Sequence, residues 1–407
     1  MGVEERALAA ASSVDPSFVV GLARELVRIP SVYDPDEEGA CEEGVALRLA
    51  EVLEGLGLEV KVDYVDRGRP NVVGLWGEGD RTILLEGHTD VVTPGDPSSW
   101  SVDPFGGEVR DGKLFGRGAC DTKGNLAAAV AAVKALAELP GGLRGRVVLC
   151  APVDEEGLML GIKHFIKRGL AEGVDGAIIC EPEDMRLCTS QKGALRAWVR
   201  LRGRMAHGAM PLSGINPAWA VGDLILGLEG LEREERAMGE DPLLGPPSVT
   251  PTVIRAPSVG PGQINVIPSE ASVGLDVRTI PVQEHGALKA KVEGLVREVA
   301  ERRGLTGFEV DFFEERPCTR TDHDDPIVRA SVRAYRLLFG EEPTFDGVPG
   351  ATDGTFLWAW AGVPIVTTGA GRRDVPHQVD EHVEVEQLLA AARFYAACSV
   401  IFLEERW

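Results

Sequence analysis

The sequence predicts an α/β protein that carries a second, smaller domain inserted into it. In the first and last parts of the chain, apolar segments of strand length alternate with helical segments, a pattern typical of a largely parallel sheet covered by helices. Residues 191–316 instead read as strand, helix, two strands, helix and strand, which is the ferredoxin-like order. We therefore expect a large domain of residues 1–190 and 317–407 and an inserted domain of residues 191–316.

The large domain begins with a helix at Asp15-Pro16, where an acidic cap precedes a proline in the first turn. Phe18, Leu22 and Leu26 form its buried stripe, and Pro30 ends it. The other helices are expected near 43–56, 125–139, 327–338 and 385–403. The expected strands are 59–64, 71–75, 82–86, 146–151, 176–180 and 364–368.

The inserted domain begins with the segment "ALRAWVRLRG", in which apolar and polar residues alternate. Leu195 and Val199 share one face and Arg196 and Arg200 the other, as in a strand with one solvated face. Helices are expected near 217–235 and 282–303, and strands near 252–258, 271–279 and 307–314.

The composition narrows the possible partners and compartment. The 407 residues carry a net charge of −22, which disfavours nucleic acid and anionic membrane surfaces. No apolar run approaches the roughly 20 residues of a membrane span, and the first residues lack the pattern of a signal peptide. Seven cysteines without metal-binding spacing fit a reducing compartment. We expect a cytoplasmic protein.

Polar clusters follow several strands of the predicted large domain. Because the carboxyl ends of parallel strands meet at one edge of a sheet, these side chains are expected to lie together. The members are His88 and Asp90, the run Asp154–Glu156, Glu181, His377 and, in a glycine-rich loop before a helix, Asp121.

The segment "VVLCAPVDEEG" passes from a buried strand directly to three acids. Carboxylates this close raise one another's pKa unless a cation lies among them. Histidines and carboxylates together suit zinc, and also cobalt or manganese, and a carboxylate that bridges two ions is typical of two-metal hydrolytic sites.

Several segments, in this order, closely resemble the M20 metallopeptidases, a family that includes acetylornithine deacetylase, succinyl-diaminopimelate desuccinylase, aminoacylase and glutamate carboxypeptidases. The resemblance covers nearly the whole chain and implies a zinc-peptidase-like catalytic domain with an inserted lid or dimerisation domain. The segments are "GHTDVV" (87–92), "WSVDPFGGEVRDGKLFGRGACDTKG" (100–124), "DEEG" (154–157), "EP" (181–182), "GRMAHGAMP" (203–211), "NVIP" (265–268), "DVR" (276–278) and "PHQVDEHV" (376–383).

The resemblance implies two zinc ions and assigns their ligands residue by residue. His88 and Glu181 would bind one ion, Glu156 and His377 the other, and Asp121 would bridge them. The family's bridging aspartate is often followed by a cis peptide bond.

The resemblance also implies roles for residues that bind no metal. Glu155 would be the general base, and Asp90 would hydrogen-bond the other ring nitrogen of His88. His207 resembles a histidine that reaches the active site of the partner in a homodimer and polarises the scissile carbonyl. Asn265 and Arg278 resemble the groups that hold the substrate carboxylate; for Arg278 a salt bridge on the face of a strand stays open.

The resemblance thus implies hydrolysis of the amide bond of an N-acyl amino acid, of the deacetylase or desuccinylase type, by a metal-activated water with a glutamate base. The alternatives are a dipeptidase or carboxypeptidase of the same family and a binding protein without catalysis. A metallophosphatase is disfavoured, because Arg278 and the segments of the inserted domain suit a carboxylate.

Overall fold

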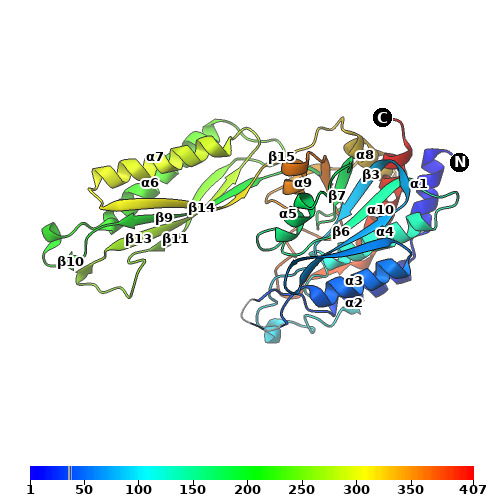
Figure 1. Cartoon of the computed structure of the whole chain (residues 1–407), viewed down its shortest axis with the longest axis horizontal. Coiled ribbons are helices and arrows are strands. Elements are labelled where there is room, and N and C mark those ends of the chain that lie inside the picture. The colour runs from blue at the N-terminus through cyan, green and yellow to red at the C-terminus, as the bar shows by residue number, and fades with distance from the viewer. Residues whose placement is uncertain (35–36, 38) are drawn as a thin grey trace. The chain divides into compact units, whose positions relative to one another are not determined.

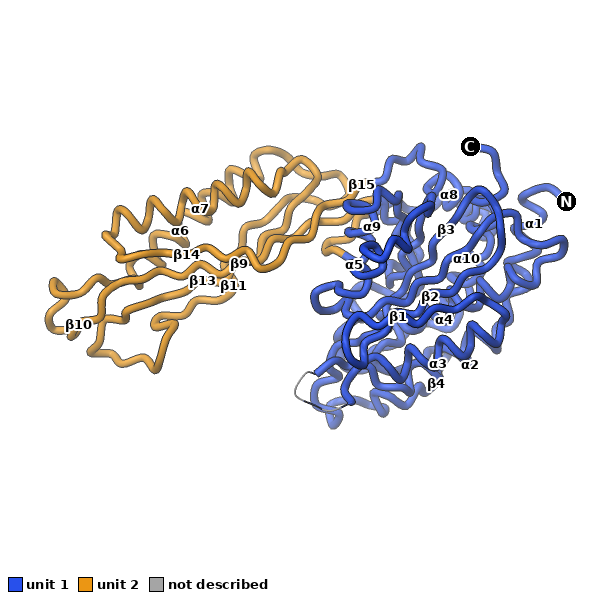
Figure 2. The backbone as a smooth tube through the Cα atoms, viewed as in Figure 1, with its two compact units in different colours: residues 1–189, 321–346, 352–407 blue, residues 190–320, 347–351 orange. Residues whose placement is uncertain are grey.

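The computed structural model of the chain describes residues 1–34, 37 and 39–407 (Figure 1). It divides into two compact units, shown in Figure 2. Unit 1 consists of residues 1–189, 321–346 and 352–407, and unit 2 of residues 190–320 and 347–351. Each unit combines a sheet with helices, and the predicted α/β class is confirmed.

The sheet of unit 1 has parallel strands at its centre and antiparallel strands at its edges. Strands β6, β3, β7 and β17 pair in parallel, while β1 and β2 pair antiparallel at one side. In the order in which they lie, the strands are β1 (Glu59–Asp66), β2 (Arg69–Trp76), β6 (Arg144–Ala151), β3 (Glu78–Glu86), β7 (Gly176–Ile179) and β17 (Ile365–Thr367). The short strands β8 (Leu187–Gln191), β15 (Thr319–Arg320) and β16 (Phe345–Val348) continue this sheet where the chain crosses the boundary between the two units. The carboxyl ends of the four parallel strands consequently lie at one edge.

Successive residues of a strand point to opposite faces of the sheet. In the central strands the residues on each face are apolar and buried, so helices cover both faces. Leu85 packs with the helices of one face and Leu84 with those of the other. The first face carries α1 (Val3–Ser12), α2 (Pro16–Val27), α3 (Glu43–Gly55), α4 (Lys123–Ala137), α8 (Pro326–Phe339) and α10 (Val385–Glu404). The second face carries α5 (Leu160–Lys167) and α9 (Gly354–Ala361). A separate small sheet contains β4 (Glu108–Arg110), β5 (Lys113–Phe115) and β18 (His382–Glu384).

Helix α10 is the central helix of the first face and packs against α1, α4 and α8. Its length and composition would allow it to cross a membrane, although Glu386 and Arg393 interrupt its apolar residues. Most of the segment is buried inside the unit. Helix α1, which the sequence analysis did not predict, is tied to α10 by the buried pair of Arg6 and Glu404 (Nε to Oε2, 2.7 Å).

Unit 2 has the predicted ferredoxin-like order of elements. Its sheet runs β11-β13-β9-β14, so that β11 and β14 are the edge strands, and the apolar face of β9 packs on its two long helices. The elements are β9 (Gly193–Arg202), α6 (Pro217–Ala237), β11 (Ser248–Arg255), β13 (Glu270–Thr279), α7 (His285–Arg302) and β14 (Gly307–Arg316). A two-stranded ribbon joins β10 (Ala206–His207) to β12 (Val266–Ile267).

Candidate functional site

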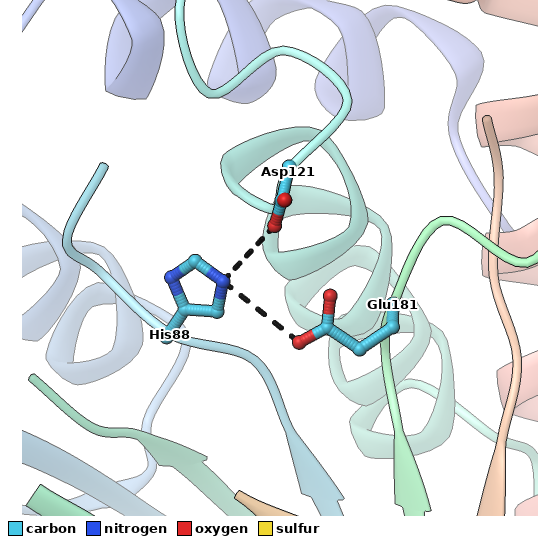
Figure 3. A group of neighbouring side chains, drawn as sticks. All are labelled: His88, Asp121 and Glu181. Carbon is cyan, nitrogen blue, oxygen red and sulfur yellow. Dashed lines mark hydrogen bonds and ion pairs between the residues drawn. The ribbon is translucent and has the colours of Figure 1, made fainter. Parts of the chain in front are cut away.

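The five predicted metal ligands come together in unit 1 as two groups that share one residue. His88, Asp121 and Glu181 form the first group, drawn in Figure 3. Asp121, Glu156 and His377 form the second. Within each group the ligand atoms all lie within 4.8 Å of one another, which is close enough for one ion to contact them all.

Each ligand lies at the edge where the parallel strands end. His88 follows β3, Glu156 follows β6 and Glu181 follows β7. His377 lies in the loop after β17, and Asp121 just precedes α4. The peptide bond between Asp121 and Thr122 is cis, as the resemblance implies.

The two oxygens of Asp121 face different histidines. Oδ1 lies 3.1 Å from Nε2 of His88, and Oδ2 lies 3.4 Å from Nε2 of His377. The remaining acids complete the groups: Oε1 of Glu181 is 3.8 Å from Nε2 of His88, and Oε1 of Glu156 is 2.8 Å from Nε2 of His377. A carboxylate that presents one oxygen to each of two groups has the arrangement required to bridge two cations.

The ring of His88 is fixed by Asp90, although not mainly through the predicted atom. Nδ1 lies 2.9 Å from the backbone carbonyl of Asp90 and 3.5 Å from its Oδ1. A carbonyl can only accept, so in the neutral ring Nδ1 carries the hydrogen and Nε2 keeps its lone pair. The lone pair points toward Asp121 and Glu181, as a metal ligand requires.

The Asp90 carboxylate instead holds the acidic loop after β6. Its Oδ1 accepts from the backbone N–H of Glu155 at 3.1 Å, and its Oδ2 from that of Glu156 at 3.0 Å. The backbone of these two acids is therefore anchored by one side chain, which leaves their own carboxylates for chemistry.

The first acid of the run, Asp154, has a structural part in this loop. Its Oδ1 accepts from Nη2 of Arg69 at 2.7 Å, and its Oδ2 accepts from the backbone N–H of Leu158 at 2.9 Å. Asp154 adopts a left-handed backbone conformation with φ of 68°. The buried charge of Arg69 is shared with Glu42, which pairs with its Nε at 2.9 Å.

The carboxylate of Glu155 is uncommitted. In the part of the chain that the structure describes, no group donates a hydrogen bond to it. Burial and the neighbouring acids Glu156 and Asp121 raise the pKa of Glu155 well above its ordinary value. A carboxyl with these properties suits a group that takes up and returns a proton.

The residues of the two groups fit divalent cations. Burial raises the pKa of Glu181 well above its usual value, and its Oε1 is buried with no hydrogen-bond partner among the described residues. Hydrogen bonds to Asp121 and Glu156 raise the pKa of His377 to about 10. Imidazole and carboxylate donors without thiolate suit zinc, cobalt or manganese, and cation binding would displace the histidine protons.

Glu381 lies in the segment "PHQVDEHV" (376–383), but the family resemblance implied no role for it. The side chain is fully buried, and its Oε1 accepts from the backbone N–H groups of Gly118, Cys120 and Asp121. Its position four residues after His377 was the one signal available in the sequence.

The three remaining candidates lie in unit 2, and the structure separates them. His207 on β10 pairs with Val266 on β12, and the N–H of Gly208 donates to the carbonyl of Asn265 at 2.7 Å. His207 and Asn265 are therefore neighbours. Arg278 lies eight residues along β13 from its start at Glu270, which corresponds to about 26 Å of extended strand.

The guanidinium of Arg278 binds Asp276 on its own strand, with Nε 2.6 Å from Oδ1 and Nη2 3.1 Å from Oδ2. This is the salt bridge on the face of a strand that the sequence allowed as an alternative role for Arg278. Because Asn265 lies beyond the other end of β13, the two residues do not form one carboxylate clamp within a single chain.

Comparison with known proteins places these features in a family. Residues 84–399 match the family model described as peptidase family M20/M25/M40. Succinyl-diaminopimelate desuccinylase from Rhodospirillum centenum is 31% identical over 405 residues, with 95% of this chain and 97% of that protein covered. The enzyme of the same name from Gluconacetobacter diazotrophicus is 32% identical over 388 residues, covering 92% and 94%.

Solved structures share the fold at lower identity. Human carnosine dipeptidase 1 aligns with a TM-score of 0.76 and 19% identity, covering 100% of both chains. An M20 family metallo-carboxypeptidase from Sulfolobus solfataricus aligns with a TM-score of 0.76 and 20% identity over 95% of this chain and 99% of its own. The chain belongs to peptidase family M20/M25/M40 and is a hydrolase that acts on amide bonds.

Proposed function

We propose that this hydrolase is a two-metal amidohydrolase that removes the acyl group from N-acyl amino acids. The observation that supports it most directly is the pair of ligand groups that share Asp121, beside the uncommitted carboxylate of Glu155. The relatives with 31–32% identity are named for removal of a succinyl group, so a substrate of the desuccinylase or deacetylase type is the first choice. The alternative is a dipeptidase or carboxypeptidase activity, which a substrate screen must distinguish from removal of an acyl group.

In this proposal His88 and Glu181 would hold one divalent ion and Glu156 and His377 the other, and Asp121 would be a ligand shared by the two groups. Zinc is the preferred metal, with cobalt or manganese as substitutes. When bound, such ions supply Lewis-acid chemistry, which lowers the pKa of a water and polarises a carbonyl.

Glu155 carries the proton in this mechanism. Its carboxylate takes a proton from the attacking water and later gives it to the leaving nitrogen. The raised pKa suits the first step, because it makes the carboxylate of Glu155 a stronger base toward the water. Asp90 holds the backbone of Glu155 during the reaction.

We further propose that His207 donates a hydrogen bond to the developing oxyanion in a second copy of the chain. His207 is exposed, and its Nδ1 accepts from the backbone N–H of Ala209 at 3.0 Å, so Nε2 carries the hydrogen and can donate it. A small substrate cannot span the length of β13 to contact both Arg278 and Asn265 in one chain. A site completed from two chains resolves this separation.

Unit 2 offers a surface for such a homodimer. Strand β11 is an edge strand with Val253 and Ile254 exposed, and an exposed apolar edge is a template for pairing. Helix α6, which packs against β11, exposes 66% of Trp219 and 67% of Leu226. Symmetric pairing of equal patches is the commonest form of oligomer.

The cytoplasm is the proposed compartment. All seven cysteines are free, which agrees with a reducing environment. Burial raises the pKa of the Cys120 and Cys180 thiols, which flank two of the ligands, well above the usual value, and this keeps them protonated and unreactive.

The proposed reaction class is tested by a substrate screen. Purified protein loaded with zinc or cobalt is assayed with N-succinyl amino acids, N-acetyl amino acids and dipeptides. We expect kcat/KM to be highest for one of the two N-acyl classes. A clear preference for dipeptides would instead support dipeptidase or carboxypeptidase activity. No hydrolysis of any of these amides would reject the proposed amidohydrolase function.

The role of Glu155 is tested by Glu155→Gln. Loss of a general base reduces kcat by about 10²–10⁴-fold, while metal content should stay at the wild-type value because Glu155 belongs to neither ligand group. Asp374→Asn is the matched control, since the side chain of this exposed acid in the loop of His377 pairs with Arg372 and with no other side chain among the described residues. A Glu155→Gln enzyme that keeps more than about half of the wild-type kcat would show that another group is the base.

A mixed-dimer experiment tests the shared site. Chains with Glu155→Gln and chains with His207→Ala, each nearly inactive alone, are mixed in equal amounts and allowed to exchange subunits. One site of every heterodimer is then intact, so about a quarter of the wild-type activity should return. No recovery after proven exchange would place His207 in the site of its own chain, and a monomer in solution would reject the dimer.

A further inference from the structure

Glu381 makes all its described contacts with the loop that leads to Asp121 and with one arginine of that loop. Its Oε1 accepts from the N–H groups of Gly118 at 3.0 Å, Cys120 at 2.9 Å and Asp121 at 3.0 Å. The backbone of the shared ligand is therefore bound directly by this carboxylate. Several N–H groups converging on one oxygen form an anion-binding concavity of the backbone.

Arg117 completes the contact on the other side of the carboxylate. Its Nη1 donates to Oε2 of Glu381, and both side chains are buried. Its Nη2 reaches the carbonyl of Thr93 at 3.3 Å and that of Gln378 at 3.4 Å. The pair thus connects three loops: the one after His88, the one before Asp121 and the one that carries His377.

Glu381 has no oxygen to spare for a cation. Oε1 is bound by three N–H groups and Oε2 by a guanidinium, and the residue belongs to neither ligand group. Its removal would leave three backbone donors and Nη1 of the buried Arg117 without their acceptor. Such groups cost more when unpaired than the bond itself contributes, so the loop would rearrange.

We propose that Glu381 is a positioning residue that fixes the backbone of Asp121, and thereby both metal groups, without contacting either ion. This inference rests on the proposed metal site. Outer groups that orient metal ligands contribute about 10–100-fold to metal affinity, and a carboxylate that orients the one shared ligand acts on two ions together.

Two substitutions test this role. Glu381→Gln removes the charge and places an amide N–H₂ against Arg117, and Glu381→Asp keeps the charge but withdraws the oxygens by one methylene. Glu404→Gln is the matched control, because Glu404 is also buried, pairs with Arg6 and accepts from the backbone N–H of Arg144. Zinc affinity is measured by competition with a chromogenic chelator, and amide exchange of residues 116–121 is measured on metal-free protein.

We expect both Glu381 variants to bind zinc about 10–100-fold more weakly and to exchange the amides of Gly118, Cys120 and Asp121 faster than wild type. The control should lose stability but keep zinc affinity. Zinc affinity within about twofold of wild type in both variants, or an equal loss in the control, would overturn the inference. A wild-type chain that binds no zinc would instead reject the proposed function, and the two failures are distinguishable.

Discussion

The arrangement of unit 1 depends on holding four carboxylates close together in a largely buried site. Burial and the charge of Asp121 raise the pKa values of Glu155, Glu156 and Glu181, and His88 opposes this rise in all three. Like charges at this spacing are unfavourable in a low dielectric. A divalent cation within each ligand group would convert this repulsion into attraction.

Much of the surrounding structure restrains the backbone that carries these acids. Asp90 binds the N–H groups of Glu155 and Glu156, and Glu381 binds that of Asp121. Asp154 closes the loop after β6. Each restraint uses a buried carboxylate as acceptor for backbone donors, so the site is supported by acids that do not themselves belong to the ligand groups.

The sequence was most informative where a local pattern determines the structure. Asp15 caps α2 as predicted, with its Oδ1 2.9 Å from the N–H of Ser17, and β9 buries its alternate residues. The five ligand candidates could be named because strand ends and motif order locate them. Helix α1 was missed because its few turns gain their order from packing on α10, through contacts such as Arg6 with Glu404.

Other details could not be read from the sequence because they depend on distant contacts or on atomic direction. Glu381 acts on residues more than 250 positions away. The spacing of His88 and Asp90 does not say whether the carbonyl or the carboxylate faces the ring. The resemblance gave Asn265 and Arg278 one shared role. The structure is needed to see that they lie at opposite ends of β13, too far apart to share it within one chain.

Metal stoichiometry shows whether two cations share Asp121. Metal-free wild-type protein and the Asp121→Ala variant are titrated with zinc, with Asp374→Ala as the control in an exposed acid. We predict two bound ions per chain in wild type and control, and loss or much weaker binding of both ions in Asp121→Ala. Two tightly bound zinc ions in Asp121→Ala, or a single ion in wild type, would contradict it.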